Sequence, residues 1–253
     1  MLAGDLVAPI EQFAPVCMQE KWDNCGFVVG DASLDVSKAL IALDCTEAVI
    51  DEAIQIGADI VITHHPLIFG GVKKISTSNW LGRIIYKAIK NNIVIYCAHT
   101  NMDKAAGGVS GLMAEQLGLK NVTVLTEDGF GLVGDLEDGI ECEKFVGELK
   151  NKFGVENIRS SEPVEEKIYR VAVCGGSGKS FIGEAMKSGA QVYVTGDITY
   201  HDFYCESGFM VFDIGHYASE YKVVDLFAEI LCKNFPTFAV SKSNRNNNPI
   251  YNY

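Results

Sequence analysis

Short, nearly continuous apolar runs alternate with longer helical patterns along this chain, and this alternation restricts the possible folds most strongly. Each run is rich in β-branched residues, as expected of a strand that is buried on both faces. The runs cover residues 38–44, 58–65, 92–99, 169–176, 190–197 and 209–216. Helical patterns cover residues 5–20, 46–57, 79–91, 105–118, 142–153, 178–189 and 217–233. Strands that alternate with helices predict parallel β-α-β units in an α/β fold.

The sequence also repeats itself. Residues 38–63 align without a gap onto residues 170–195, and the match includes Thr63 with Thr195. We therefore expect two related β-α-β halves, built on mostly parallel or mixed sheets flanked by helices, with a metal site between them. The expected halves are residues 1–125 and 126–253, and their elements can interleave.

The end of the third strand in each half carries a related pair of polar residues. The first half has His99-x-x-x-Asp103 and the second has His216-x-x-x-Glu220. Outside the repeat, the stretch 120–168 has its own strand-helix pattern, and the polar tail that begins at Ser241 is expected to be irregular.

The composition excludes some classes of partner. The 253 residues carry a formal net charge of −12. A surface this acidic repels a phosphate backbone, which argues against nucleic-acid binding by electrostatic attraction. The charge says little about a small substrate, because a bound cation can reverse the local field.

The cysteines and the N-terminus predict a cytoplasmic protein. None of the eight cysteines forms a C-x-x-C pair, and several lie within apolar runs, as free buried thiols in a reducing compartment would. The first residues lack the basic start and apolar stretch of a signal peptide. No apolar run reaches the roughly 20 residues that cross a bilayer, so we expect no membrane association.

The histidines gather where strands are predicted to end. His64, His65, His99 and His216 lie at or just beyond a predicted strand end, and His201 follows another by four residues. A single histidine is more often an ordinary core or surface residue. In open α/β sheets, however, ligands bind in the crevice outside the carboxyl ends of the strands. The whole set therefore favours a functional site at these ends.

Two local patterns give this site its ligands. In Thr-His-His-Pro, Pro66 cannot extend a central strand, so His64 and His65 can leave the strand and reach different ions. The plain alternative is a turn with polar residues. His216 and Glu220 are four apart at the start of a helical pattern, which places both side chains on one helical face.

The summed set is three imidazoles and two carboxylates, from His64, His65, Asp103, His216 and Glu220. This is too many ligands for one tetrahedral zinc ion with an open position, but it suits two ions about 3.5–4 Å apart. Nitrogen and oxygen ligation without thiolate suits Zn, Mn, Fe, Ni or Co. The remaining histidines, His99 and His201, are assigned to orienting ligands or to moving protons.

Two other motifs have a structural and a functional interpretation. CGGSGKSF at 174–181 resembles a phosphate-binding loop, but the position that needs the first glycine is Val173. A tight β-α turn is the favoured interpretation, and anion binding is the alternative. Trp22-Asp23-Asn24-Cys25-Gly26 is expected to be a structural turn, although Asp23 and Asn24 could face the site.

These same motifs resemble those of a known family. WDNCGFVVGD, ITHHPLIF, AHTNMDKAAGG, VTGDITYH and IGHYASE are similar, in this order, to the GTP cyclohydrolase 1 type 2 homolog family, also known as the NGG-interacting-factor-three-like family. The resemblance runs from about residue 5 to residue 235. It implies two α/β parts, a dinuclear metal site and a ring-shaped homohexamer with an internal cavity. It also implies that the metal ligands are His64, His65, Asp103, His216 and Glu220.

Two functional hypotheses of different classes follow. The first is a metal-dependent hydrolase that acts on a nucleotide or a related small molecule, with His99 or His201 moving protons. The second is a non-enzymatic metal-binding scaffold or regulatory protein that acts through protein partners. The substrate, the native metal and the size of the assembly do not follow from the sequence.

Overall fold

The computed structural model describes residues 1–164, 167–245 and 247–251, and these form two compact units. Unit 1 contains Met1–Met102 and Val223–Asn247, and unit 2 contains Asp103–Lys222 and Asn248–Tyr253. The chain thus passes from the first unit to the second at residues 102–103, not at residue 125. It later returns to unit 1, because the last long helix and the last strand pack against the first sheet.

Unit 1 is built on a five-stranded sheet in the order β1-β4-β3-β2-β11. The strands are β1 Gly26–Val29, β2 Lys38–Ala42, β3 Ile60–Thr63, β4 Val94–Cys97 and β11 Ala239–Lys242. β1 is antiparallel to β4, and the other neighbouring pairs are parallel. The expectation of an irregular tail from Ser241 is wrong at its first two residues. Ser241 and Lys242 lie in β11, because they continue its pairing along the open edge of β2.

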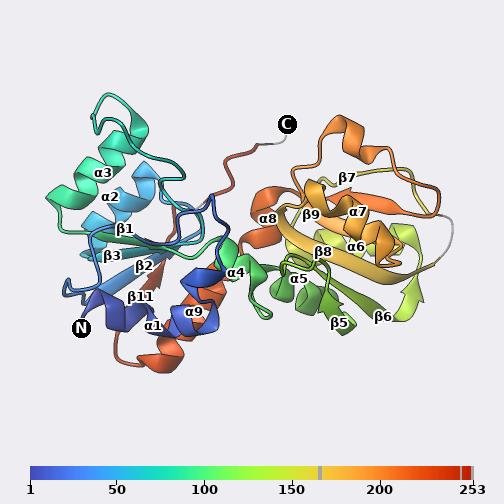
Figure 1. Ribbon diagram of the computed structural model, residues 1–253, viewed down its shortest axis with the longest axis horizontal. Coiled ribbons are helices and arrows are strands. Elements are labelled where there is room, and N and C mark those ends of the chain that lie inside the picture. Colours follow the sequence, from blue (N-terminus) through green and yellow to red (C-terminus); the bar gives the residue numbers. More distant parts are fainter. Residues whose placement is uncertain (165–166, 246, 252–253) are drawn as a thin grey trace. The chain divides into compact units, whose positions relative to one another are not determined.

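Helices cover both faces of this sheet (Figure 1). They are α1 Ala3–Phe13, α2 Glu47–Ile56, α3 Trp80–Lys90 and α9 Val223–Asn234, and the 3₁₀ turn η1 Val16–Met18 follows α1. α2 and α3 pack on one face through Val49, Ile50 and Ile84. The buried strand positions explain why β2, β3 and β4 read as continuous apolar runs: both faces of the sheet are covered.

Local sequence signals set the ends of the helices. The Thr46 side chain accepts a hydrogen bond from the Val49 backbone N–H at the start of α2, and Gly57 ends that helix at φ 69°. The first helix, predicted over 5–20, ends at Phe13 instead. Pro15 explains the difference, since the residue before a proline is disfavoured in helical conformation.

Unit 2 contains a six-stranded mixed sheet in the order β5-β6-β8-β9-β10-β7. The strands are β5 Lys120–Val124, β6 Leu132–Ile140, β7 Arg159–Ser160, β8 Ile168–Ser177, β9 Val192–Gly196 and β10 Met210–Asp213. β8, β9 and β10 are parallel, and β5, β6 and β7 extend the sheet in antiparallel pairings.

The helices of unit 2 create a core on each face of its sheet. They are α5 Val109–Leu117, α6 Cys142–Phe153, α7 Ile182–Lys187 and α8 His216–Glu220, with the 3₁₀ turns η2 Lys179–Phe181 and η3 Tyr200–Phe203. One core joins α5 and α6 to the strands through Met113, Phe145 and Phe212. The opposite core contains Ala185 of α7 and Tyr193 of β9.

The repeated segments occupy equivalent places in the two units. In unit 1, Ala39 of β2 pairs with Ile60 of β3. In unit 2, the aligned residues Val171 and Val192 pair in the same way between β8 and β9. The gapless sequence match therefore reflects a common β-α-β framework with the same strand register.

The register corrects the matching of the two polar pairs. Cys97 ends β4 and Asp213 ends β10, each paired with the aligned threonine of the neighbouring strand. His99 is the second residue after Cys97 and lies before α4 Thr100–Lys104. His216 is the third residue after Asp213 and begins α8. When the two strands are aligned, His99 and His216 therefore differ by one position. Each is nevertheless four residues before an acidic residue, Asp103 or Glu220.

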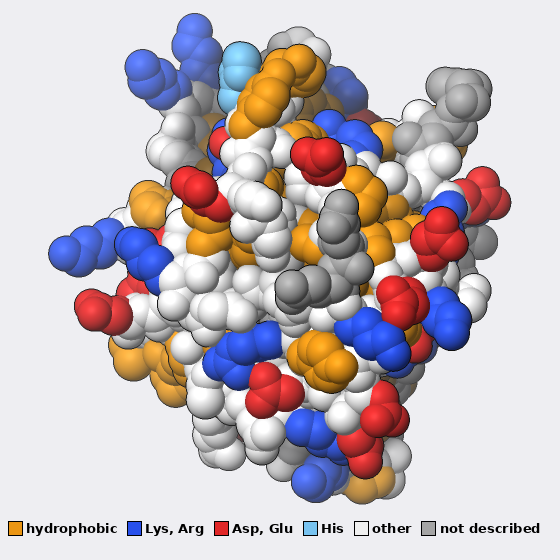
Figure 2. All heavy atoms as spheres, turned by 90° about the vertical axis from the view of Figure 1, so that its right-hand side faces the viewer, with side chains coloured by type: hydrophobic (Ala, Val, Ile, Leu, Met, Phe, Trp, Pro, Cys, Tyr) orange, Lys and Arg blue, Asp and Glu red, His pale blue; other side chains and the backbone are white. Residues whose placement is uncertain are grey.

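Charges of both signs lie on the surface of this protein. Basic and acidic side chains are interspersed over the face shown in Figure 2, and neither sign gathers into one patch there. None of the described helices combines the length and apolar character needed to cross a bilayer.

Candidate metal centre

His64 is the first residue after β3, and its ring is held by the neighbouring loop. The side chain is buried, and its Nδ1 lies 2.9 Å from the Ala98 carbonyl oxygen. A carbonyl oxygen can only accept a hydrogen bond, so Nδ1 is the donor. In the neutral ring the lone pair is then on Nε2, which is the arrangement that metal-binding histidines usually show.

His65 has a carboxylate in the same role. Its Nδ1 lies 2.8 Å from Asp44 Oδ1, and its backbone N–H donates to the Leu43 carbonyl oxygen over 3.0 Å. Thr63 Oγ1 also donates to the His65 carbonyl oxygen over 2.8 Å, which fixes the turn that leaves β3. The backbone and the ring of His65 are therefore both held in place.

His99 is held by the turn that precedes β1. Its Nδ1 lies 3.0 Å from Asp23 Oδ1, and Thr100 donates to Asp23 Oδ2 through its backbone N–H and its hydroxyl. Burial raises the pKa of the Asp23 carboxyl, but the hydrogen bonds from His99 and Thr100 outweigh burial and hold it well below its usual range. Asp23 therefore faces the histidines, which is the functional alternative for this turn.

The three rings of unit 1 lie close together. The ring centroids are 5.0 Å apart for His64 and His65, 5.2 Å for His64 and His99, and 5.4 Å for His65 and His99. One ring nitrogen from each residue lies within 4.8 Å of the other two. Trp22 and Phe69 contact the His99 ring edge-on, at centroid distances of 6.1 and 5.6 Å.

A partly buried thiol, that of Cys25, lies beside these rings. Burial raises the pKa of Cys25 to about 12. Its Sγ lies 3.2 Å from Asp23 Oδ2 and 3.1 Å from Asn101 Oδ1, as a protonated thiol that donates to these oxygens would. Among the described residues, the group of possible ligand atoms here consists of ring nitrogens from His64, His65 and His99 and does not include Cys25.

In unit 2, His216 lies between two carboxylates. Its Nδ1 donates to Asp197 Oδ2 over 2.8 Å, and its Nε2 lies 3.0 Å from Glu220 Oε2. Burial disfavours the charged ring, but Glu220 and Asp197 outweigh burial and raise the pKa of His216 to about 9. A metal ion that bound Nε2 would replace the proton on that nitrogen.

Asp103 joins this pair within unit 2. One of its carboxylate oxygens lies within 4.8 Å of one from Glu220. The Cys174 thiol is buried nearby, and burial together with the charges of Asp103 and Glu220 raises its pKa to about 12. The unit 2 cluster therefore offers two carboxylates and one imidazole, with no thiolate.

The glycine-rich end of β8 has a steric role beside this cluster. A Cβ on Gly176, which has φ +62°, would lie 2.2 Å from Glu220 Oε1. The Gly176 N–H donates to Ser219 Oγ over 2.9 Å, and this hydroxyl donates to the His216 carbonyl oxygen over 2.7 Å. The expected tight turn begins later than predicted: residues 174–177 still belong to β8, whose pairing with β9 is irregular between Val173 and Ser177, and the chain enters η2 after Gly178. The missing side chain of Gly176 leaves room for Glu220.

His201 lies elsewhere in unit 2. It is exposed in η3, and its ring contacts those of Tyr200 and Tyr204 at centroid distances of 5.2 and 6.4 Å. Among the described residues, it belongs to none of the groups of ligand atoms that could hold a metal ion. Its predicted role in proton transfer stays a prediction.

Asp44 and Asp197 are functional candidates that the sequence analysis missed. Asp44 follows β2, whose neighbour β3 precedes His65, and Asp197 follows β9, whose neighbour β10 precedes His216. In the sequence repeat, Asp197 aligns with His65. Asp197 has φ 56°, an uncommon conformation for a residue other than glycine that aspartate tolerates better than most. Acidic residues at the carboxyl ends of strands were the available signal.

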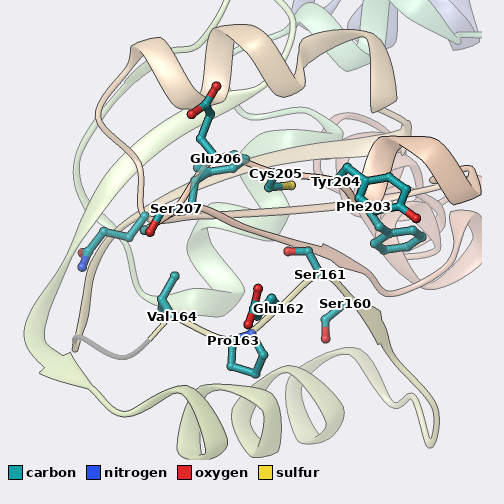
Figure 3. Close-up of a pocket in the computed structure, with 13 residues that line it drawn as sticks. Ser160, Ser161, Glu162, Pro163, Val164, Phe203, Tyr204, Cys205, Glu206 and Ser207 are labelled. Atoms are coloured by element: carbon teal, nitrogen blue, oxygen red, sulfur yellow. The ribbon is translucent and has the colours of Figure 1, made fainter.

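A separate cavity of about 880 Å³ lies in unit 2, between residues 160–164 and 203–209. Figure 3 shows side chains of these two segments on opposite sides of the hollow. Gln191 and Phe209 line it just before β9 and β10 begin, whereas His216 follows the other end of β10. Within unit 2, the cavity and His216 therefore lie at opposite ends of the parallel strands.

Comparison with known proteins identifies relatives over nearly the whole chain. Residues 1–249 match the family model described as Duf34/NIF3 (NGG1p interacting factor 3). A relative from Clostridium perfringens named "GTP cyclohydrolase 1 type 2 homolog" is 40% identical over 232 residues, which cover 88% of each chain. One of the same name from Clostridium acetobutylicum is 37% identical, covering 90% of this chain and 88% of the relative.

The fold is also found among solved structures. A Bacillus cereus protein related to NIF3 superposes with a TM-score of 0.92 at 26% identity, covering 100% of this chain and 99% of the other. The expected α/β fold, with two sheets flanked by helices, is confirmed.

Proposed function

Because the chain belongs to the Duf34/NIF3 family, we propose that it holds two divalent metal ions and uses them to hydrolyse a nucleotide or a related small molecule. The name shared by its relatives, "GTP cyclohydrolase 1 type 2 homolog", supports this substrate class. The proposed metal ligands are His64, His65, Asp103, His216 and Glu220.

One observation carries the metal proposal: each proposed imidazole ligand has an oxygen at Nδ1. His64 bonds to the Ala98 carbonyl, His65 to Asp44 and His216 to Asp197. Such a partner fixes the ring and increases the basicity of the nitrogen that binds the metal. Histidines that are only packed or exposed need not share this arrangement, and the sequence offers only five histidines in all.

The donor set is compatible with the proposed ions. Imidazole nitrogens and carboxylate oxygens without thiolate suit Zn, Mn, Fe, Ni or Co. Asp103 and Glu220, which lie close together in unit 2, supply the negative charge that offsets part of the charge of the cations. No cysteine belongs to the groups of possible ligand atoms among the described residues.

The chemistry that divalent ions supply in such a site is polarisation of a substrate group and activation of water at neutral pH. The protein's part is to hold its donors in fixed orientations. Asp44 and Asp197 prevent the rings of His65 and His216 from rotating, and Gly176 leaves the space that Glu220 occupies. Proton transfer by His99 or His201 is part of the hydrolase proposal and is tested separately from metal binding.

Metal content tests the first part of the proposal. Untagged protein is supplemented with Zn²⁺, Mn²⁺, Fe²⁺, Ni²⁺ or Co²⁺ near neutral pH, gel-filtered and analysed by mass spectrometry of the metal. We expect about two ions per chain for the native metal. Fewer than about one ion per chain with every metal contradicts the proposal.

Turnover tests the second part. Metal-loaded protein is incubated with GTP, other nucleotides, phosphoesters and cyclic amides, and products are separated by chromatography. We expect one class to react, and Glu220→Gln to abolish the reaction. If metal-loaded protein turns over none of them, the scaffold role becomes the better account. Full biological function in a variant such as His65→Ala that has lost its metal would likewise argue against catalysis.

We also propose that the chain assembles into a ring-shaped homohexamer. Several large apolar side chains of unit 1 are exposed on α3 and the loop before it, and burying them would favour assembly. They are Phe69, Ile75, Trp80, Tyr86 and Ile89. Light scattering during gel filtration measures the mass directly. A mass near six chains is expected, and a monomer at micromolar concentration contradicts this assembly.

A further inference from the structure

The cavity of unit 2 between residues 160–164 and 203–209 has no part in the proposed metal chemistry. We propose that it is a separate binding site for a small organic cation, an ammonium group carried on an apolar body. The proposal is independent of the metal ions, because the cavity and His216 lie at opposite ends of the parallel strands.

One wall of the cavity forms where the chain leaves the edge of the sheet. β7 contains only Arg159 and Ser160, which pair with the end of β10. At the next residue, Ser161 Oγ accepts from the Val211 N–H over 2.9 Å, and the Ser161 N–H donates to the Val211 carbonyl oxygen over 3.1 Å. Pro163 has no N–H with which to continue the pairing. The pairing with β10 therefore ends here, and the cavity begins.

The opposite wall is the connection from η3 to β10, and contacts outside the hollow hold its shape. The Phe209 N–H donates to the Glu206 carbonyl oxygen over 3.2 Å. The Arg159 guanidinium lies over the Phe203 ring, 5.4 Å from its centroid, and forms an ion pair with the buried Asp213. Both walls are thus fixed without a ligand, and the volume of about 880 Å³ is typical of sites for small organic molecules.

The charge of the lining favours a cation. The described lining residues include two carboxylates, Glu162 on one wall and Glu206 on the other, and no Lys, Arg or His. Neither carboxylate forms a hydrogen bond or an ion pair with any other described residue. Lys167, close in sequence, lies 3.8 Å from Glu141 instead. An anion in the cavity would meet two uncompensated negative charges, whereas a cation is attracted by both.

The rest of the lining favours an organic cation over a metal ion. Figure 3 shows Phe203 and Tyr204 on the wall opposite Glu162, and Val164 adds an apolar side chain. Tyr204 is 74% exposed, and its hydroxyl lies 3.0 Å from that of Tyr200. Aromatic rings attract ammonium groups through their faces and pack against apolar bodies. A bare metal ion would leave this apolar surface unused.

Benzylamine and benzyl alcohol are matched probes, because they share a ring and differ in charge at neutral pH. Each is titrated into the metal-loaded, full-length chain, and binding is measured by calorimetry and by saturation-transfer NMR. Benzylamine should bind at least about threefold more tightly than benzyl alcohol, since only the amine is attracted by the carboxylates and the aromatic faces. Added salt should reduce this difference.

Variants locate the binding. Glu162→Gln and Tyr204→Ala should each weaken benzylamine binding by about threefold, and the double variant by about 10-fold. Glu162→Gln should change the affinity for benzyl alcohol by less than about twofold, because that probe carries no charge. Glu156→Gln is the matched control, since it removes an exposed glutamate of the same unit that does not line the cavity. Circular dichroism shows whether each variant is folded.

Because an amine nitrogen can also bind a metal ion, the titration is repeated on chelated protein. The affinity for benzylamine should agree within about twofold between the two forms, since the cavity contains no proposed metal ligand. Three results overturn the proposal: no binding of benzylamine at tens of millimolar, binding that is lost on chelation, or an unchanged affinity in the double variant. A chain that binds no metal contradicts the proposed function and leaves this test intact, so the two failures are distinguishable.

Discussion

Unit 1 and unit 2 share a β-α-β framework with the same register, but they place different chemistry at the ends of its strands. After β3 of unit 1 come His64 and His65, whereas the aligned residues after Thr195 of β9 in unit 2 are Gly196 and Asp197. Unit 1 gathers three imidazoles, and unit 2 gathers two carboxylates and one imidazole.

The difference shows which part of a repeated fold determines position and which determines chemistry. The register of the strands decides where residues gather, and the one or two residues after each strand decide the donors. Asp44, which holds the His65 ring, aligns with Gly176 of unit 2. At the aligned position, unit 2 has a glycine, because Glu220 Oε1 occupies the space that a side chain would fill.

The largest expected effect comes from removing the imidazoles of unit 1. His64→Ala combined with His65→Ala should weaken metal binding by more than about 100-fold, because this variant loses ligands and not only their supporting partners. Equilibrium dialysis with metal mass spectrometry measures the change. His201→Ala provides the control, and equal metal content in the double variant and the native chain would show that unit 1 is not a metal-binding unit.

Removal of the metal should lower stability next. A ligand that binds only the folded state stabilises it by about 2.7 kcal/mol at a concentration of 100 Kd. Chelated protein should therefore unfold at lower denaturant concentration, and added Zn²⁺ or Co²⁺ should restore the native value. The same chelation should leave the His64→Ala/His65→Ala variant almost unchanged. If chelation lowered the unfolding midpoint equally in both proteins, the stabilising metal would not be bound by His64 and His65.

Gly176→Ala tests whether the glycine in unit 2 is needed for Glu220. Alanine at a positive φ costs about 1 kcal/mol, and the overlap with Glu220 should add roughly 1–3 kcal/mol. Gly154 is a matched control, because its φ is +65° and nothing lies within 4 Å of its added Cβ. Urea unfolding should show the larger loss for Gly176→Ala, together with weaker metal binding. Equal losses for the two variants would mean that Glu220 moves aside freely.

The smallest of these effects should come from the residues behind the ligands. Asp44→Asn acts on His65 and Asp197→Asn acts on His216, and each should weaken metal binding by about 10-fold. The double variant tests whether the two carboxylates act independently, because only independent changes have additive free energies. Calorimetric titration of the single and double variants measures this. No loss in either variant would show that the carboxylates do not hold the rings for a metal.

Much of this architecture could be predicted from the sequence. The continuous apolar runs identified the buried parallel strands, and the gapless match of 38–63 with 170–195 identified two units with a common framework. The histidines were found because they follow those strands. These features depend on local patterns that the chain carries along its length.

Other features depend on contacts between distant residues. The pairing of Asp23 with His99 joins residues 76 apart, and that of Asp44 with His65 joins residues 21 apart. The one-residue displacement of His99 relative to His216 became visible only in the strand register. The return of β11 to the edge of β2 likewise depends on tertiary pairing, since its polar residues do not resemble a buried strand.

The most direct test of the metal account is anomalous diffraction from crystals grown with Zn²⁺ or Co²⁺. Data collected on either side of the metal absorption edge locate the ions without reference to the protein. We predict a strong peak about 2.1 Å from a ring nitrogen of His64 or His65, on the side of the ring opposite Nδ1. Metal-loaded crystals with no anomalous peak at any of the proposed ligands would contradict the account.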